Sequence, residues 1–149
     1  MILWRISNYA DLSGHGGLLH RGRWHNRGRP IVYLAESAAG ALLEVLVHAQ
    51  ASHPSELPRD FQLLEVEVPA QATMESALVP DKVVWQHDLN LTRRLGDRWL
   101  HSAPSLLLRV PSAVLGRTDN WLLNPAHPQA VGCRIASALR YPFDARLSR

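Results

Sequence analysis

Three side chains able to recognise or stabilise charge lie close together in the sequence between Gly22 and Glu44. Arg23 is permanently charged and can grip a phosphate or carboxylate through paired hydrogen bonds. Tyr33 offers an aromatic ring that can stack on a flat heterocycle, and Glu44 is a lone carboxylate among apolar neighbours. Together they could hold a charged, aromatic small molecule and stabilise a cation that forms within it.

These three residues fall on three successive predicted elements. A loop rich in arginine runs from Arg21 to Arg29, and the apolar, β-branched run 30–34 predicts a strand. Ser37 is a suitable N-cap for a helix over 38–49, whose apolar residues recur at helical spacing. The polar stripe of that helix is narrow and comprises Ser37, Gly40, Glu44 and His48. Gly40, one turn before Glu44, leaves room for a ligand beside the carboxylate.

Each candidate residue also has a purely structural interpretation. Glu44 would mark the solvent face of an amphipathic helix, and the arginines would form a solvated or nucleic-acid-binding loop. Tyr33 and Trp24 would be packed core aromatics. Ser112, just after the apolar run 106–110, could bind a ribose or phosphate or simply end a turn, and it lacks the Gly-x-Ser-x-Gly setting of a nucleophile. Residue types alone leave both interpretations open.

The remaining pattern predicts an α+β fold with short strands and few helices. Further strands are expected at 1–6, 61–68, 106–110, 121–123 and 135–139, and helical spacing appears around Leu91, Leu95 and Trp99. Loops are expected at 13–17, which is rich in glycine, and at 51–60, while 124–128 is expected to form a turn. The elements do not alternate regularly, and 149 residues suit one domain over 1–149 with its own core.

Composition narrows the functional classes. The formal charge of +3 and pI of about 9.6 favour an anionic partner. Cys133 is the single cysteine, so no intrachain disulfide forms and a reducing cytoplasm is expected. No apolar run approaches the roughly 20 residues of a membrane helix, so no membrane association is expected. The eight histidines are scattered without a His-Glu-x-x-His motif, and no metal site is expected.

With these motifs the chain resembles the RES-domain toxins of bacterial Xre–RES toxin–antitoxin pairs, named for an arginine, a glutamate and a serine. The matching positions are Arg23 in Gly22-Arg23-Trp24, Glu44 within 41–46 and Ser112 within 108–112, with Tyr33 within 30–35 as a fourth. Further matches are Trp4-Arg5, 96–99, 120–128 and 142–147. They follow the family order along nearly the whole chain. His25 stands where the family usually has asparagine and Arg21 where glycine is common, and Ser105 lies near the serine position.

The resemblance implies an ADP-ribosyltransferase-like fold with mainly antiparallel strands and NAD⁺ as the substrate rather than a resident cofactor. It implies that Glu44 stabilises an oxocarbenium-like ribose while Arg23, Trp24, Tyr33 and Ser112 bind NAD⁺, with Arg5 as a second phosphate contact. Nicotinamide is cationic on the ribose and leaves neutral, so one carboxylate suffices where glycosidases need two. The implied partner is an Xre-family helix-turn-helix antitoxin that blocks the cleft, and a toxin dimer within the complex is compatible with the family.

Two alternatives to an NAD⁺ glycohydrolase remain open in the sequence. The first is an ADP-ribosyltransferase that modifies a protein. It shares the cation-stabilising step with the hydrolase, and the sequence contains no motif that identifies the acceptor. The second is a basic nucleic-acid-binding protein or ribonuclease that uses the loop 21–29. The modest charge and the lack of interleaved aromatics disfavour direct nucleic-acid binding, which is expected only through the antitoxin.

Overall fold

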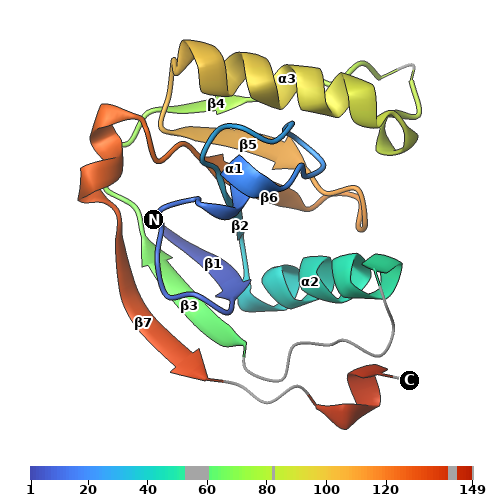
Figure 1. Ribbon diagram of the computed structural model, residues 1–149, viewed down its shortest axis with the longest axis vertical. Helices are drawn as coiled ribbons and strands as arrows, with labels where there is room; N and C mark the ends of the chain where they lie inside the picture. Colours follow the sequence, from blue (N-terminus) through green and yellow to red (C-terminus); the bar gives the residue numbers. More distant parts are fainter. Residues whose placement is uncertain (53–60, 82, 141–143, 149) are drawn as a thin grey trace.

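The computed structural model describes residues 1–52, 61–81, 83–140 and 144–148. Its strands form a single seven-stranded sheet (Figure 1). The strand order is β4-β5-β6-β2-β1-β3-β7, and every neighbouring pair is antiparallel except β4 and β5. The elements in chain order are β1 Ile2–Ser7, α1 Gly16–Leu19, β2 Val32–Ala35, α2 Ala38–Ser52, β3 Gln62–Glu67, β4 Met74–Ser76, the 3₁₀ turn η1 Trp85–His87, α3 Leu89–Ser102, β5 Leu107–Pro111, β6 Asp119–Leu123, the 3₁₀ turn η2 Pro128–Gly132, β7 Arg134–Arg140 and the 3₁₀ turn η3 Ala145–Ser148.

The predicted α+β architecture is confirmed, and each predicted strand and helix is present with ends shifted by a few residues. The N-cap prediction is confirmed too, because the Ser37 hydroxyl accepts the Gly40 backbone N–H at 3.0 Å. Besides the three 3₁₀ turns, one helix and one strand had no sequence signal. β4 has three exposed residues that pair along the edge of β5. Helix α1 lies where a flexible loop was predicted, and its Gly17 packs so closely on Arg29 and Ile31 that a side chain would not fit.

One further boundary differs from the prediction. The loop expected over 51–60 is helical at its first two residues, because α2 continues to Ser52. Residues 53–60 lie outside the described part of the chain. None of the described helices combines the length and apolar character that a membrane span requires.

Two apolar clusters cover the two faces of the β5–β6–β2 half of the sheet. One face carries Leu108, Val110 and Leu122, which pack with Trp99 and Leu100 of α3. The opposite face carries Val32, Leu34, Leu107 and Leu123, which pack with residues of β1 and β3. Strands β1 and β2 share one registered pair, Trp4 with Ala35, and the second cluster joins residues from both halves of the sheet.

Helices α2 and α3 flank the strands that carry the candidate residues. Figure 1 shows α3 above the β5–β6–β2 half of the sheet and α2 below it, beside β1. The connection from β2 to α2 is only two residues long, so the helix begins directly at the strand's end. This short connection brings the α2 carboxylate back over the ends of β5 and β6.

Candidate functional site

Glu44 is joined directly to two side chains from distant parts of the chain. Its Oε1 atom accepts hydrogen bonds from the Ser112 hydroxyl and from the Asn120 side-chain amide, both at 2.7 Å. Ser112 and Asn120 are 68 and 76 residues away in the sequence. Hydrogen bonds to a carboxylate are shorter and stronger than those between neutral groups, so the three residues form one rigid unit.

Strand pairing brings these residues together. Asn120 lies on β6 between Val110 of β5 and Ala35 of β2, its registered neighbours on either side. Ser112 follows the last residue of β5, and its hydroxyl also accepts the backbone N–H groups of the next turn, at 3.1 and 3.2 Å. A Cβ on Gly40 would lie 3.6 Å from the Cβ of Ala35, so α2 begins very close to β2.

A second unit surrounds the Tyr33 hydroxyl. This oxygen accepts the backbone N–H of Trp24 at 3.1 Å and lies 2.8 Å from His25 Nδ1. The other ring nitrogen of His25, Nε2, lies 2.9 Å from the His20 carbonyl oxygen. A carbonyl can only accept, so Nε2 carries the proton of the neutral ring and Nδ1 accepts from the Tyr33 hydroxyl. The arginine loop is thereby fastened to the middle of β2.

Burial keeps both rings of this unit neutral. Desolvation is the main cause that raises the pKa of Tyr33 well above its usual range and lowers the pKa of the His25 imidazole. Hydrogen bonding to the His20 carbonyl and the charge of Asp97 act in the opposite direction on His25, and the nearby Arg93 acts with burial. A protonated phenol and a neutral imidazole are the states that this hydrogen-bond pattern requires.

Arg23 is held through its side chain and its backbone. The guanidinium Nη1 donates to the Gln86 carbonyl of η1 at 2.9 Å, and the Arg23 carbonyl accepts the Thr92 hydroxyl at 2.6 Å. Arg93 of α3 donates its Nε to the Gly22 carbonyl at 2.8 Å. The predicted solvated loop is therefore anchored to α3 and η1 around Arg23.

The alternation of side chains places both units on one face of the sheet. Tyr33 and Ala35 are two residues apart on β2 and share a face, and their registered neighbours on β6 are Leu122 and Asn120. This is the face that α3 covers through Leu122. We call Arg23, Trp24, His25 and Tyr33 the Arg23–Tyr33 unit, and Glu44, Ser112 and Asn120 the Glu44 unit. Within the described residues no hydrogen bond joins the two units. They are two separately fixed halves of one candidate site.

The structure places three other sequence candidates elsewhere or in other roles. Trp24 is 2 % exposed and its ring lies against Trp85 at 5.8 Å in the core, while its backbone N–H is bonded to the Tyr33 hydroxyl. Ser105 is bound to the Trp99 indole N–H and the Leu107 carbonyl at 2.9 and 2.8 Å. Only Ser112 of the two serines contacts Glu44.

Arg5 is not brought to either unit by a described contact. Its guanidinium donates to the Asp11 carbonyl at 2.9 Å, and partial burial lowers its pKa. Strand alternation turns Arg5 to the opposite face from Trp4, whose registered partner is Ala35. Its suggested phosphate contact stays a prediction.

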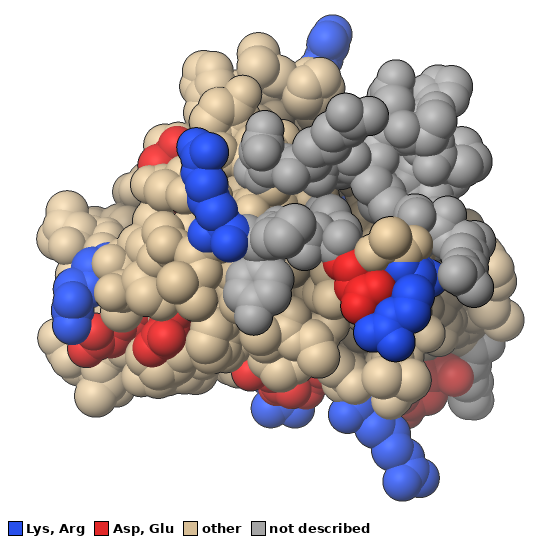
Figure 2. Space-filling model, turned by 90° about the horizontal axis from the view of Figure 1, so that it is seen from below, with Lys and Arg blue, Asp and Glu red and all other residues tan. Residues whose placement is uncertain are grey.

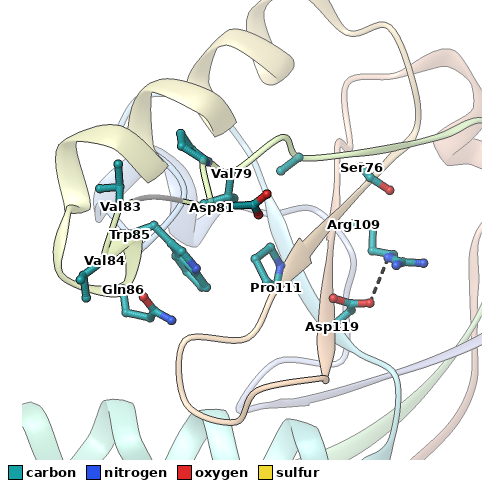
Figure 3. Close-up of a pocket in the computed structure, with 12 residues that line it drawn as sticks. Ser76, Val79, Asp81, Val83, Val84, Trp85, Gln86, Arg109, Pro111 and Asp119 are labelled. Carbon is teal, nitrogen blue, oxygen red and sulfur yellow. Dashed lines mark ion pairs between the residues drawn. The ribbon is translucent and has the colours of Figure 1, made fainter.

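An open cavity of about 650 Å³ adjoins the site at the edge of β5 (Figure 3). Trp85 and Gln86 face Pro111 across it, and Arg109 pairs with Asp119 at 3.0 Å on its far side. Gln86, which lines the cavity, also accepts the hydrogen bond from the Arg23 guanidinium through its carbonyl, so Arg23 lies next to the cavity. Among the described residues there is no group of three histidine, cysteine or acidic side chains suited to a metal ion.

Sequence reasoning missed two contacts of this candidate site. Asn120 was noted only as part of a family motif, and nothing local distinguishes it from a strand asparagine. His25 was noted as a departure from the family, and its role as the partner of Tyr33 had no signal because it depends on burial. Both contacts join residues that the fold, rather than sequence spacing, brings together.

The mostly antiparallel sheet, its two flanking helices and the Glu44–Ser112–Asn120 contacts define an α+β protein with one candidate site. The RES domain family matches residues 2–144, and the chain belongs to that family. It is 51% identical over 136 residues to Toxin Res of Pseudomonas putida, covering 91% of this chain and 92% of the relative. It is 34% identical over 157 residues to the Prs ADP-ribosylating toxin of a Sphingobium species, covering 98% and 96%.

A solved structure shares the fold. The crystal structure of the M. tuberculosis MbcT–MbcA toxin–antitoxin complex matches with a TM-score of 0.73 and 17% identity. The match covers 95% of this chain and 84% of the other. This likeness confirms the architecture predicted from the sequence.

Proposed function

We propose that this protein is the toxin of a toxin–antitoxin pair and that it cleaves NAD⁺ at the bond between nicotinamide and ribose. Membership of the RES family and the name Toxin Res of its 51% identical relative support the first part. The clamped Glu44 carboxylate supports the second. It is the single observation that carries the proposal, because it joins two of the family's three naming residues within hydrogen-bond distance.

The chemistry follows from the charge of the leaving group. As the ribose–nicotinamide bond breaks, its electron pair goes to the ring nitrogen, which turns neutral, and positive charge develops on the ribose. Glu44, fixed before the reaction, stabilises that charge, and such preorganised groups contribute about a hundredfold or more in rate. An acceptor oxygen then bonds to the ribose carbon and gives up its proton, for which Glu44 is a nearby base.

The remaining residues take binding roles in this proposal. Arg23 binds the diphosphate or the adjacent ribose, and its contact with Gln86 directs the guanidinium toward the cavity edge. The Tyr33 ring lines the sheet face near nicotinamide, while its hydroxyl keeps the arginine loop in place. Ser112, which is hydrogen-bonded to Glu44, holds the ribose of the substrate beside that carboxylate.

A second acceptor has support from a relative. The Sphingobium protein that is 34% identical to this chain carries the name Prs ADP-ribosylating toxin. A protein acceptor on this chain would use the same first step as hydrolysis. NAD⁺ labelled in its adenosine part distinguishes the two outcomes, because transfer leaves label on a protein and hydrolysis releases free ADP-ribose.

An antitoxin partner is also part of the proposal. The similar fold comes from a toxin–antitoxin complex, and Arg23, Glu44 and Asn120 of the two site units are all partly exposed. An Xre-type antitoxin that covers these residues would block NAD⁺. A dimer of toxins within such a complex stays a prediction.

The direct nucleic-acid alternative has weaker support. On the face shown in Figure 2, basic side chains lie singly or beside acidic ones rather than in a continuous patch. Arg134 pairs with Glu67, and Arg146 with Asp144 at 2.7 Å. RNA cleavage without loss of NAD⁺ would favour this alternative over the proposal.

The decisive experiment replaces Glu44 with glutamine. We expect Glu44→Gln to lose at least a hundredfold in nicotinamide release from NAD⁺, because the amide removes the negative charge at nearly unchanged size. Glu67→Gln is the matched control, since it removes a carboxylate from an exposed pair on β3. Parent-like nicotinamide release by a folded Glu44→Gln protein would refute the mechanism.

A further inference from the structure

Asn120 makes one contact that the proposed mechanism does not yet use. Its amide nitrogen and the Ser112 hydroxyl both donate to the same carboxylate oxygen, Oε1 of Glu44. Neither described bond uses Oε2. Two hydrogen bonds to the same oxygen fix the plane of the carboxylate and leave Oε2 without a donor among these contacts. We call Ser112 and Asn120 together the clamp, and it determines that Oε2 is the oxygen available to a ligand.

The two donors come from different settings: the Ser112 side chain is buried at the start of a turn, and Asn120 lies within a strand. Ser112 begins a turn of exposed residues, where its hydroxyl also accepts backbone N–H groups from Val114 and Leu115. Asn120 lies inside β6, with β5 on one side and β2 on the other. Its backbone is therefore fixed by strands on both edges, and its side-chain amide starts from a fixed position on the sheet.

The neighbours of Asn120 leave its amide room to reach α2. Its registered partner on β2 is Ala35, which has a small side chain and is 3 % exposed. A Cβ at Gly40 would lie 3.6 Å from the Cβ of Ala35, so the first turn of α2 is in ordinary contact with the end of β2. A side chain larger than alanine at position 35 would lie on the same face of the sheet, directly beside the Asn120 amide.

We propose that Asn120 is a positioning residue that orients Glu44 and directs Oε2 toward the ribose of the substrate. This inference rests on the proposed NAD⁺ cleavage. A neutral amide is suited to the task, because it donates to the carboxylate without neutralising the charge that the reaction needs. A cationic donor in its place would weaken the field at the ribose.

The chemistry predicts a kinetic signature. Asn120 touches Glu44 rather than the substrate, so its loss lowers kcat and changes KM little. We expect Asn120→Ala to lower kcat about 10-fold to 100-fold, the scale of a hydrogen bond to a charged group, while KM changes less than about threefold. Asn8→Ala is the matched control, since it removes an exposed asparagine side chain at the end of β1.

Asn120→Asp tests positioning against a structural role. The variant has nearly the same shape but places a second carboxyl group beside Glu44, and two such groups at this distance do not both ionise easily. We expect the acid limb of kcat/KM against pH to move to higher pH by more than about one unit. A side chain that packs without facing Glu44 would change the melting temperature and leave the pH profile in place.

The measurements are nicotinamide release across pH and thermal unfolding by circular dichroism for all proteins. Folded Asn120→Ala with the parent kcat, or Asn120→Asp with the parent pH profile, overturns the inference while the proposed function stands. If Asn120→Ala does not fold, the pH profile of Asn120→Asp decides alone. If the parent protein releases no nicotinamide, the proposed function fails first, and the positioning role fails with it.

Discussion

Replacing Gly96 with alanine should separate α3 from the arginine loop. A Cβ at this position would overlap the carbonyl oxygen of Trp24 and lie 2.8 Å from its carbonyl carbon. The obstacle is backbone, so no side-chain rotation relieves it. Either α3 or the loop must move, and that loop carries Arg23 and the N–H group that holds Tyr33.

Opposing effects set the size of the change. Alanine in a helix interior is favoured over glycine by about 1 kcal/mol, whereas overpacking of this kind costs about 1–3 kcal/mol. Displacement also strains two bonds between α3 and the loop, those of Thr92 and Arg93, each worth about 1 kcal/mol. The losses exceed the gain, and we expect a decrease of about 2 kcal/mol in the free energy of unfolding.

The assay is urea unfolding followed by tryptophan fluorescence, together with nicotinamide release. Trp24 and Trp99 are both buried at this contact, so the signal reports on it directly. Gly16→Ala is the matched control, because it adds a methyl group to another helical glycine with open space around it. A Gly96→Ala protein as stable as the parent, with unchanged activity, would refute the reasoning.

Two more predictions concern the residues around the site. Because burial lowers the pKa of His25, the unfolded chain binds its proton more readily, and the stability due to this group is lost as pH falls below about 6.5. Urea unfolding at pH 7.5 and 5.5 should therefore show a larger loss for the parent than for His25→Asn, and equal losses would contradict this. Ser105→Ala should lower the free energy of unfolding by about 1–3 kcal/mol, since the buried Trp99 N–H loses its acceptor. Ser112→Ala should lower nicotinamide release, because Glu44 loses one of its two donors, whereas Ser105→Ala should leave release by the folded protein near the parent level. The opposite effects on release would exchange the roles of the two serines.

Local pattern was enough to predict most of the fold. Strands with alternating or β-branched residues and helices with a 3.6-residue period depend on neighbours along the chain, so β3, α2 and α3 could be located closely. The cap at Ser37 is also local. By contrast, β4 is an exposed three-residue edge strand and α1 packs through glycine, and neither leaves a periodic signal.

The sequence by itself determined which side chains are chemically available, the order in which they occur, and the family they resemble. Arg23, Tyr33, Glu44 and Ser112 were all named from their residue types and motifs. Only the tertiary structure decided that Ser112 rather than Ser105 contacts Glu44, and that Asn120 shares the same carboxylate oxygen. Those contacts join residues about 70 positions apart through the pairing of β5, β6 and β2, and such non-local pairing leaves no trace in local spacing.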